Sequence, residues 1–397
     1  MAKKLNTWTL SGLMVGPILG SGILLLPPLV YARLGSQAVW AWVAVLGLGA
    51  AFAVVFIRMA LRTRSAAGIS ELVAREWGPV WGKLAANYLT GAVIFGAIPV
   101  CLTAARLWPA SLSGGIPVNG LAAILLSLIV VLLLLGLTTV SRVSLALSSI
   151  TAVCLLLGGT LGLVGAGAVN WPGPRWDDPG LGPTLLLAFW AVVGWEVVGN
   201  YTNEVERPQR TIPRAGLISL AAVTAVYLVT VLALQTLSPG TGGPGSMAAV
   251  LVPLFREAAP VVAGVLAGGL CLVTVLMFAG AVAGMTAQRF GWKSSRPMVL
   301  ILAATSFLLL LAVQQRWTDV EGLVSMANLF FLGNALLGLA AAWKILAGGL
   351  WRVTIVVLAA VLLLLVAQGA FLGWLLVVAV TLGTFVYALF KARAPGS

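Results

Sequence analysis

The sequence predicts an all-α integral membrane protein with twelve transmembrane helices. Two of these helices are broken, and ten of them form two inverted repeats of five. The chain is 61% hydrophobic and only 8% charged, with a mean hydropathy of +1.09, a composition that excludes an ordinary soluble domain. Its uncharged stretches recur at the length of about 20 residues that crosses a bilayer. Two of these stretches carry glycine-containing interruptions near their middle.

Charges and Gly/Pro clusters divide the apolar sequence into twelve spans. In chain order they are expected near residues 9–32, 38–58, 84–107, 119–138, 143–169, 183–202, 214–237, 261–287, 298–313, 320–343, 353–366 and 370–390. A long loop is expected over 58–83, a Gly/Pro/Ser-rich loop over 238–246, and a short amphipathic segment over 251–259. We predict one transmembrane domain over 1–397, with repeats over about 9–169 and 183–343 and two final helices over about 351–390.

Lysine and arginine are distributed unevenly between the two sides that these spans define. With a cytoplasmic N-terminus, 18 of the 23 basic residues fall in cytoplasmic segments. The remaining five fall on the outer side: Arg33, Arg106, Arg175, Arg256 and Arg316. Adding or removing one central span would destroy this bias, so it supports both the number of spans and their orientation. Both termini are therefore expected in the cytoplasm.

The first span is interrupted at residues 16–23, which read GPILGSGI. Such irregular backbone is tolerated at membrane depth only where protein or a wet cavity satisfies its N–H and C=O groups. The half-helix that restarts after the break directs unpaired amides and a positive dipole end into that cavity. The break is therefore a candidate binding site for a carboxylate.

A similar interruption occurs in the sixth span, where residues 189–196 read FWAVVGWE. The two breaks are five spans apart, and because five is odd, the broken helices cross the membrane in opposite directions. This spacing is typical of inverted repeats with a binding site between them near the bilayer midplane. In the alternative interpretation, the glycines only allow close helix packing.

Glu196 is the only acidic residue deep inside any predicted span. An ionisable group at this depth costs about 3 kcal/mol or more and by default marks a functional site. We expect this carboxyl to exchange a proton during transport, because an apolar environment favours its neutral form. Alternatively, it is a neutral carboxyl that hydrogen-bonds to the broken backbone.

Several other classes of protein do not fit this composition. Histidine is absent, and Cys101, Cys154 and Cys271 lie in separate apolar segments. No metal centre, disulfide or cofactor is therefore expected. The three cysteines are interpreted as packing residues. A membrane enzyme would need a nucleophile with a base or a metal cluster, and the sequence offers neither. A channel would need a repeated filter or rings of charge, and neither is visible in the sequence. A sensor would need a larger output domain. The net charge of +13 lies in loops without interleaved aromatics, which argues against nucleic acid.

The motifs at the two breaks resemble those of the amino acid–polyamine–organocation (APC) transporter superfamily. The resemblance rests on residues 20–23 (GSGI), on residues 194–196 (GWE) and on the loop pattern ERPQRTIPR over 206–214. Residues 98–99 (IP) and 326–328 (MAN) are more similar to its bacterial exporters of methionine and branched-chain amino acids. The resemblance implies a LeuT-like fold, secondary transport of an amino acid by alternating access, and a bacterial or archaeal cytoplasmic membrane. The oligomeric state, monomer or homodimer, stays open.

The resemblance also implies roles for individual residues. Ser21 and Gly22 are expected to bind the substrate carboxylate, and the carbonyls of Ile18, Trp190 and Val193 the amine. The aromatic that covers the substrate falls on Trp190, and the gating, proton-sensitive glutamate on Glu196. The same two motifs add further substrate-binding positions: Gly20, Ile23 and Gly194. Pro17 departs from the usual pattern and is expected to alter the backbone carbonyls that this turn offers.

The expected pocket walls carry no formal charge. They are Phe95 and Gly96 in the third span, Phe189 and Trp190 in the sixth, and Asn328 in the tenth. Such walls favour neutral apolar amino acids, because a buried cation would lack a partner other than Glu196. Cationic amino acids or polyamines remain the alternative if Glu196 faces the substrate. For Phe95 and Asn328, ordinary helix packing is an equally good explanation.

The coupling ion stays open between a proton and sodium. Several members of the superfamily carry a lysine in the fifth span that replaces a sodium ion, but residues 148–151 read SSIT here. A proton therefore cannot be assigned to that route. Ser148 and Thr274 are the candidate sodium ligands.

Overall fold

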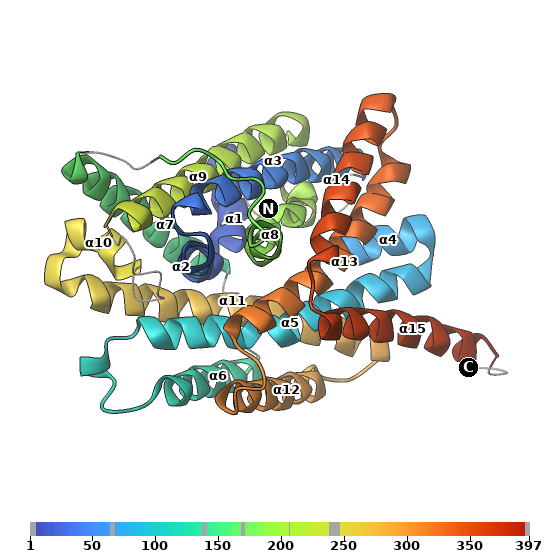
Figure 1. The fold of residues 1–397 in the computed structure, drawn as a ribbon. Helices are drawn as coiled ribbons and strands as arrows, with labels where there is room; N and C mark the ends of the chain where they lie inside the picture. The colour runs from blue at the N-terminus through green and yellow to red at the C-terminus, as the bar shows by residue number, and fades with distance from the viewer. Residues whose placement is uncertain are drawn as a thin grey trace.

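The computed structural model describes residues 5–63, 68–136, 141–167, 171–205, 207–237 and 247–393. These ranges are almost entirely helical (Figure 1). The first half contains α1 (Thr7–Leu19), α2 (Gly22–Leu34), η1 (Gly35–Gln37), α3 (Ala38–Thr63), α4 (Ile69–Trp77), α5 (Pro79–Leu107), η2 (Ala110–Leu112), α6 (Val118–Leu134) and α7 (Ser141–Ala166). The second half contains α8 (Leu181–Ala188), η3 (Phe189–Val192), η4 (Trp195–Glu204), α9 (Pro208–Leu237), α10 (Met247–Phe255), η6 (Arg256–Ala258), α11 (Ala259–Phe290), α12 (Arg296–Gln314), α13 (Val320–Ile345), α14 (Gly349–Ala367) and α15 (Phe371–Arg393).

Each of the twelve predicted spans corresponds to described helices. By length and composition, nine helical stretches in the described ranges can cross a membrane, and three shorter apolar helices accompany them. Two of the shorter ones, Thr7–Leu19 and Leu181–Val192, are the first halves of the broken first and sixth spans. The predicted loop over 238–246 and Glu206 of the 206–214 motif lie outside the described residues. The boundaries of the two repeats stay a prediction.

The predicted long loop over residues 58–83 is wrong, because most of it is helical. Helix α3 continues to Thr63, α4 covers Ile69–Trp77, and α5 already begins at Pro79. Charges end an apolar run in the sequence, but they do not end a helix when they lie on its polar face. In α4 the apolar residues Ile69, Leu72 and Val73 are buried, with i, i+3, i+4 spacing.

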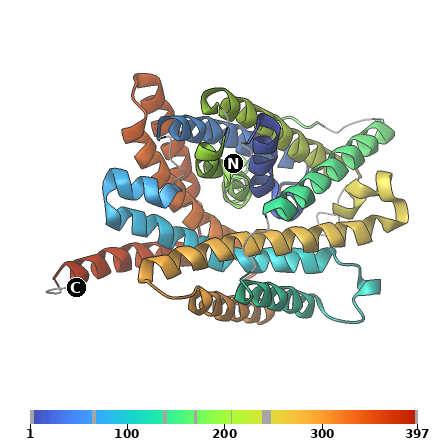
Figure 2. The ribbon, with the colours of Figure 1, turned by 180° about the vertical axis from the view of Figure 1, so that it is seen from behind.

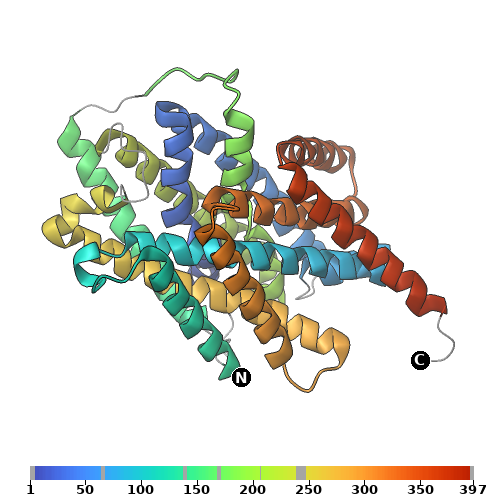
Figure 3. The same ribbon diagram turned by 60° about the horizontal axis from the view of Figure 1, so that its bottom comes forward.

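Two long helices, α5 and α11, run side by side across the middle of the molecule (Figures 1 and 2). The group containing α1, α2, α3, α8 and α9 lies on one side of them, and the pair α6 and α12 on the other. Helices α14 and α15 lie at one edge, where α15 packs against α5 and α13 (Figure 3). The two broken helices are therefore surrounded by unbroken ones.

The cysteines are less dispersed than their sequence positions suggested. Cys101 of α5 and Cys271 of α11 are both buried, and their sulfur atoms lie 3.6 Å apart. The sequence places these cysteines in separate apolar segments, and the fold brings two of those segments into contact. The pair is brought together by the packing of α5 against α11, which residue spacing alone does not reveal.

Candidate functional site

The first break is a glycine-centred turn between α1 and α2. Gly20 has φ +38° and ψ −142°, a conformation that side-chain-bearing residues rarely adopt, and its N–H donates to the carbonyl of Gly16 at 2.8 Å. The chain resumes as a helix at Gly22, and the Ser21 carbonyl accepts hydrogen bonds from the amides of Leu24 and Leu25. The amides of Gly22 and Ile23 precede the first of these bonds, as expected at a helix N-terminus.

The second break lies directly against the first. After η3, Val193 is extended and Gly194 has φ +120°, and the chain then continues in the 3₁₀ helix η4. A Cβ atom added to Gly194 would lie 2.9 Å from Cγ1 of Ile18 and 3.3 Å from its backbone N and Cα. Only glycine permits both this φ and this approach, so the two sequence motifs meet through Ile18 and Gly194.

Two buried hydroxyls flank the start of α2. Within the described part of the chain, neither Ser21 Oγ nor Tyr227 Oη of α9 has a hydrogen-bond partner. A Cβ atom added to Gly22 would lie 3.4 Å from the Tyr227 hydroxyl. Trp42 of α3 stacks on the Tyr227 ring with centroids 4.5 Å apart, which fixes the ring beside the break.

Tyr227 was not among the residues predicted from the sequence. It lies in the middle of an uninterrupted apolar span, where a tyrosine is most simply interpreted as a core aromatic. The only available signal was the polar end of a side chain that is fully buried in a membrane helix, because such a group normally finds a partner. Its position beside Gly22 is a tertiary contact.

Trp190 lies over Gly96 of α5. A Cβ atom on Gly96 would lie 2.8 Å from Cη2 of the indole, and Phe331 of α13 contacts the indole edge at a centroid distance of 5.8 Å. Gly96, Trp190, Thr274 and Phe331 line a cavity of about 20 Å³. That volume is close to what one water molecule needs. Any amino acid that binds here therefore requires the indole to move.

The remaining predicted wall residues occupy different positions. Phe95 stacks on Phe330 at a centroid distance of 5.9 Å and does not line the Trp190 cavity. Asn328 is fully buried, and its amide donates to the carbonyls of Leu186 and Leu187 at 2.8 and 2.9 Å. Asn328 therefore binds two carbonyls at the end of α8, where the Leu186 carbonyl also accepts from the Phe189 amide, and in this structure it supports the broken helix.

Glu196 lies beside the second break. Its Oε2 accepts a hydrogen bond from the Gly194 amide at 2.9 Å. The residue lines a cavity of about 10 Å³ together with Phe189, Val193 and Asn334, separate from the Trp190 cavity. The carboxyl thus accepts a hydrogen bond from the amide that the glycine turn exposes. Phe189 and Val193 line the Glu196 cavity and not the Trp190 cavity.

The two hydroxyls proposed as ion ligands both lie against the first break. Ser148 Oγ of α7 donates to the Gly16 carbonyl at 3.4 Å, and a Cβ on Gly20 would lie 3.4 Å from Thr274 Oγ1 of α11. Hydroxyl oxygens from two helices, α7 and α11, therefore approach the carbonyl end of α1. Hydroxyls and carbonyls are the ligands that a hard cation prefers.

A family model described as "Amino acid permease" matches residues 5–392. The chain belongs to this family of the APC superfamily. The permease is a multi-pass membrane protein, and its family and fold are those of transporters. A solved structure of MhsT in complex with L-phenylalanine superposes with a TM-score of 0.61, at 14% identity, over 93% of this chain and 100% of the other. The fold is therefore LeuT-like, as predicted.

Characterised relatives of the permease differ in their substrates. The cadaverine/lysine antiporter of Escherichia coli (strain K12) is 28% identical over 276 residues, which are 66% of this chain and 61% of the relative. The L-methionine/branched-chain amino acid exporter of the same strain is 24% identical over 277 residues, which are 67% and 65% of the two chains. The matched region thus spans less than two thirds of either relative's length.

Proposed function

We propose that the permease is a secondary transporter of neutral, apolar amino acids that works by alternating access around the two breaks. The observation that carries this proposal is the pair of buried hydroxyls of Ser21 and Tyr227 beside the amide end of α2, neither of which has a partner among the described residues. A buried polar group without a partner costs about 1–3 kcal/mol. A substrate carboxylate would accept hydrogen bonds from both hydroxyls and from the Gly22 amide, in the field of a helix N-terminus.

The substrate amine is assigned to backbone carbonyls across the site. The carbonyls concerned belong to the two breaks that contact each other, and they are those of Ile18, Trp190 and Val193. Because a carbonyl oxygen has two lone pairs, one that already accepts a hydrogen bond can accept a second. The Trp190 carbonyl already accepts the Val193 amide at 3.1 Å. A zwitterion would thus be held at its charged end without a side-chain charge.

The surroundings of Trp190 favour an apolar substrate side chain. The cavity beside the indole is lined by Ala92, Val93, Gly96 and Phe278, and none of its described lining residues is acidic, whereas Glu196 lines a separate cavity. A lysine or polyamine ammonium placed here would be buried without a counter-charge, which is strongly unfavourable. Cationic amino acids and polyamines are the second candidate substrates, because the cadaverine/lysine antiporter is similar in sequence to this chain.

Substrate exchange in proteoliposomes tests the proposal. We expect preloaded leucine or methionine to exchange with the external amino acid, while lysine and cadaverine do not compete. Protein-free vesicles give the leak rate. Exchange of lysine or cadaverine with no exchange of leucine would favour the second candidate, and exchange of neither class above leak would contradict both.

The driving ion and the orientation are part of the same proposal. We propose that the coupling ion is a proton and that Glu196 is the carboxyl that exchanges it. The alternative is a sodium ion held near Ser148 and Thr274. Comparing transport driven by a pH gradient with transport driven by a sodium gradient separates the two. We also propose a bacterial or archaeal inner membrane with both termini in the cytoplasm, based on the distribution of basic residues. Export as the direction rests on resemblance to the methionine exporter alone.

A further inference from the structure

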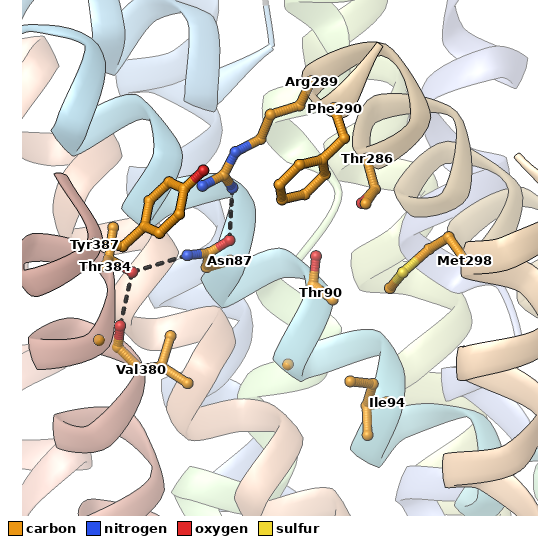
Figure 4. A pocket seen from close by; sticks show the side chains of 12 residues that line it. Asn87, Thr90, Ile94, Thr286, Arg289, Phe290, Met298, Val380, Thr384 and Tyr387 are labelled. Atoms are coloured by element: carbon orange, nitrogen blue, oxygen red, sulfur yellow. Dashed lines mark hydrogen bonds between the residues drawn. The ribbon is translucent and has the colours of Figure 1, made fainter. Parts of the chain in front are cut away.

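A cavity lies away from both breaks, between α5, α11, α12 and α15. Its volume is about 420 Å³. Figure 4 shows Arg289 of α11, Asn87 of α5 and Thr384 of α15 at one end of this cavity, with Tyr387 beside the guanidinium. None of the residues proposed to bind the amino acid lines it. The cavity therefore needs a separate explanation.

Among the described residues that line the cavity, Arg289 is the one cation and none is acidic. Arg289 Nη1 donates to Asn87 Oδ1 at 2.8 Å, and the Asn87 amide donates to Thr384 Oγ1 at 2.8 Å. The ion pairs in the described ranges are Arg33–Glu321 and Arg75–Glu76, neither of which involves Arg289. The asparagine thus holds the guanidinium at the cavity wall while most of its five N–H donors stay available.

The rest of the cavity is apolar and reaches the outer surface of the helices. Ile94, Met298, Phe290 and Val380 line it, and the Phe290 side chain is 50% exposed and Tyr387 48% exposed. In a chain with this many apolar helices, exposed aromatic side chains on such a surface contact lipid rather than water. The cavity therefore combines an anion-binding end with an apolar slot that opens towards the bilayer.

We propose that this cavity binds an anionic phospholipid, with the phosphate at Arg289 and an acyl chain along the apolar wall. Arginine suits this role because its planar guanidinium donates two parallel hydrogen bonds to phosphate oxygens. Asn87 lies in the first third of α5, whereas Arg289 is in the last turn of α11. With the predicted orientation, both positions are in the cytoplasmic half of the membrane, where basic pockets between helices recognise anionic head groups.

Lipid binding to the purified full-length chain tests this assignment. Native mass spectrometry would compare phosphatidylglycerol with phosphatidylethanolamine of the same acyl chains. We expect phosphatidylglycerol to bind about tenfold more tightly to the wild type, and Arg289→Gln to abolish that preference. Arg352→Gln is the matched control. Arg352 lies over the Trp343 ring as Arg289 lies over the Phe290 ring, but Arg352 does not line the cavity.

A second variant tests the cavity itself while keeping the arginine. Gly383 lines the cavity, and a Cβ atom there would meet nothing within 4 Å, so Gly383→Leu fills the slot without a backbone clash. We expect it to weaken binding of both lipids about tenfold. Unchanged lipid binding in Gly383→Leu, or a retained preference in Arg289→Gln, would overturn the proposal. Displacement of the lipid by an equal concentration of inorganic phosphate would overturn the lipid assignment. None of these readouts depends on amino acid transport.

Discussion

At the scale of single residues, the carboxylate end of the site depends on Ser21 and Tyr227. We expect Ser21→Ala and Tyr227→Phe each to weaken leucine binding about tenfold, because each removes one hydrogen bond to a charged group. Isothermal titration in detergent would measure the dissociation constants. Thr230→Val is the control, since Thr230 Oγ1 is also buried and unpartnered in the described chain but lies one turn beyond Tyr227 on α9. Equal losses in all three variants would contradict the assignment.

Gly96 controls the position of the indole that fills the site. A methyl group at this position would lie 2.8 Å from Trp190 Cη2, so Gly96→Ala must displace the ring. We expect the Michaelis constant for leucine to change at least about threefold, since the ring defines the wall of the site. Gly47→Ala is the control, because a Cβ there meets nothing within 4 Å. Initial uptake rates over a range of leucine concentrations would separate the two variants.

Glu196→Gln tests the proposed proton coupling. The amide oxygen of glutamine can still accept the Gly194 hydrogen bond, so the broken helix should keep its geometry while the residue loses its ability to titrate. We expect leucine exchange at constant pH to continue, whereas accumulation driven by a pH gradient is lost. Accumulation by the variant at the wild-type rate would exclude Glu196 as the coupling carboxyl.

At the scale of elements, contact between the two broken helices depends on Gly194. Alanine there would have an unfavourable positive φ, at a cost of about 1–2 kcal/mol, and would also press on Ile18. We therefore expect Gly194→Ala to lower the melting temperature in detergent by several degrees. In α7, Gly165→Ala meets nothing within 4 Å and should leave it unchanged. A variant as stable as wild type would mean that the breaks are not closely packed.

The elements that the sequence predicts best are those with unambiguous local signals. Long apolar runs marked the spans, and glycines inside such runs marked both breaks, because both signals are local. Residues 58–83 were misassigned because charges were interpreted as a loop although they occupy helical faces. The contact of Cys101 with Cys271, the support of α8 by Asn328 and the position of Tyr227 are tertiary packing effects. No spacing along the chain encodes them.

At the scale of the whole molecule, contacts close both ends of the broken-helix region. At one end, Arg33 in the last turn of α2 pairs with Glu321 in the first turn of α13. At the other end, the Leu5 amide just before α1 donates to the Glu204 carbonyl of η4 at 2.8 Å. Alternating access requires these two sets of contacts to open in turn, so each should bias the equilibrium between the two openings.

Charge exchange at the first of these contacts tests that expectation. A partly exposed ion pair contributes about 0–1 kcal/mol, and Arg33→Glu also places two carboxylates together, so it should raise the population open on that side by about fivefold. The rate at which a maleimide labels Val100→Cys, corrected for labelling of the parent protein, would report this population, because Val100 lines the Trp190 cavity. Adding Glu321→Arg to Arg33→Glu reverses both charges and should restore the original labelling rate. Faster labelling that persists in the doubly exchanged protein would show that the ion pair does not hold this side closed.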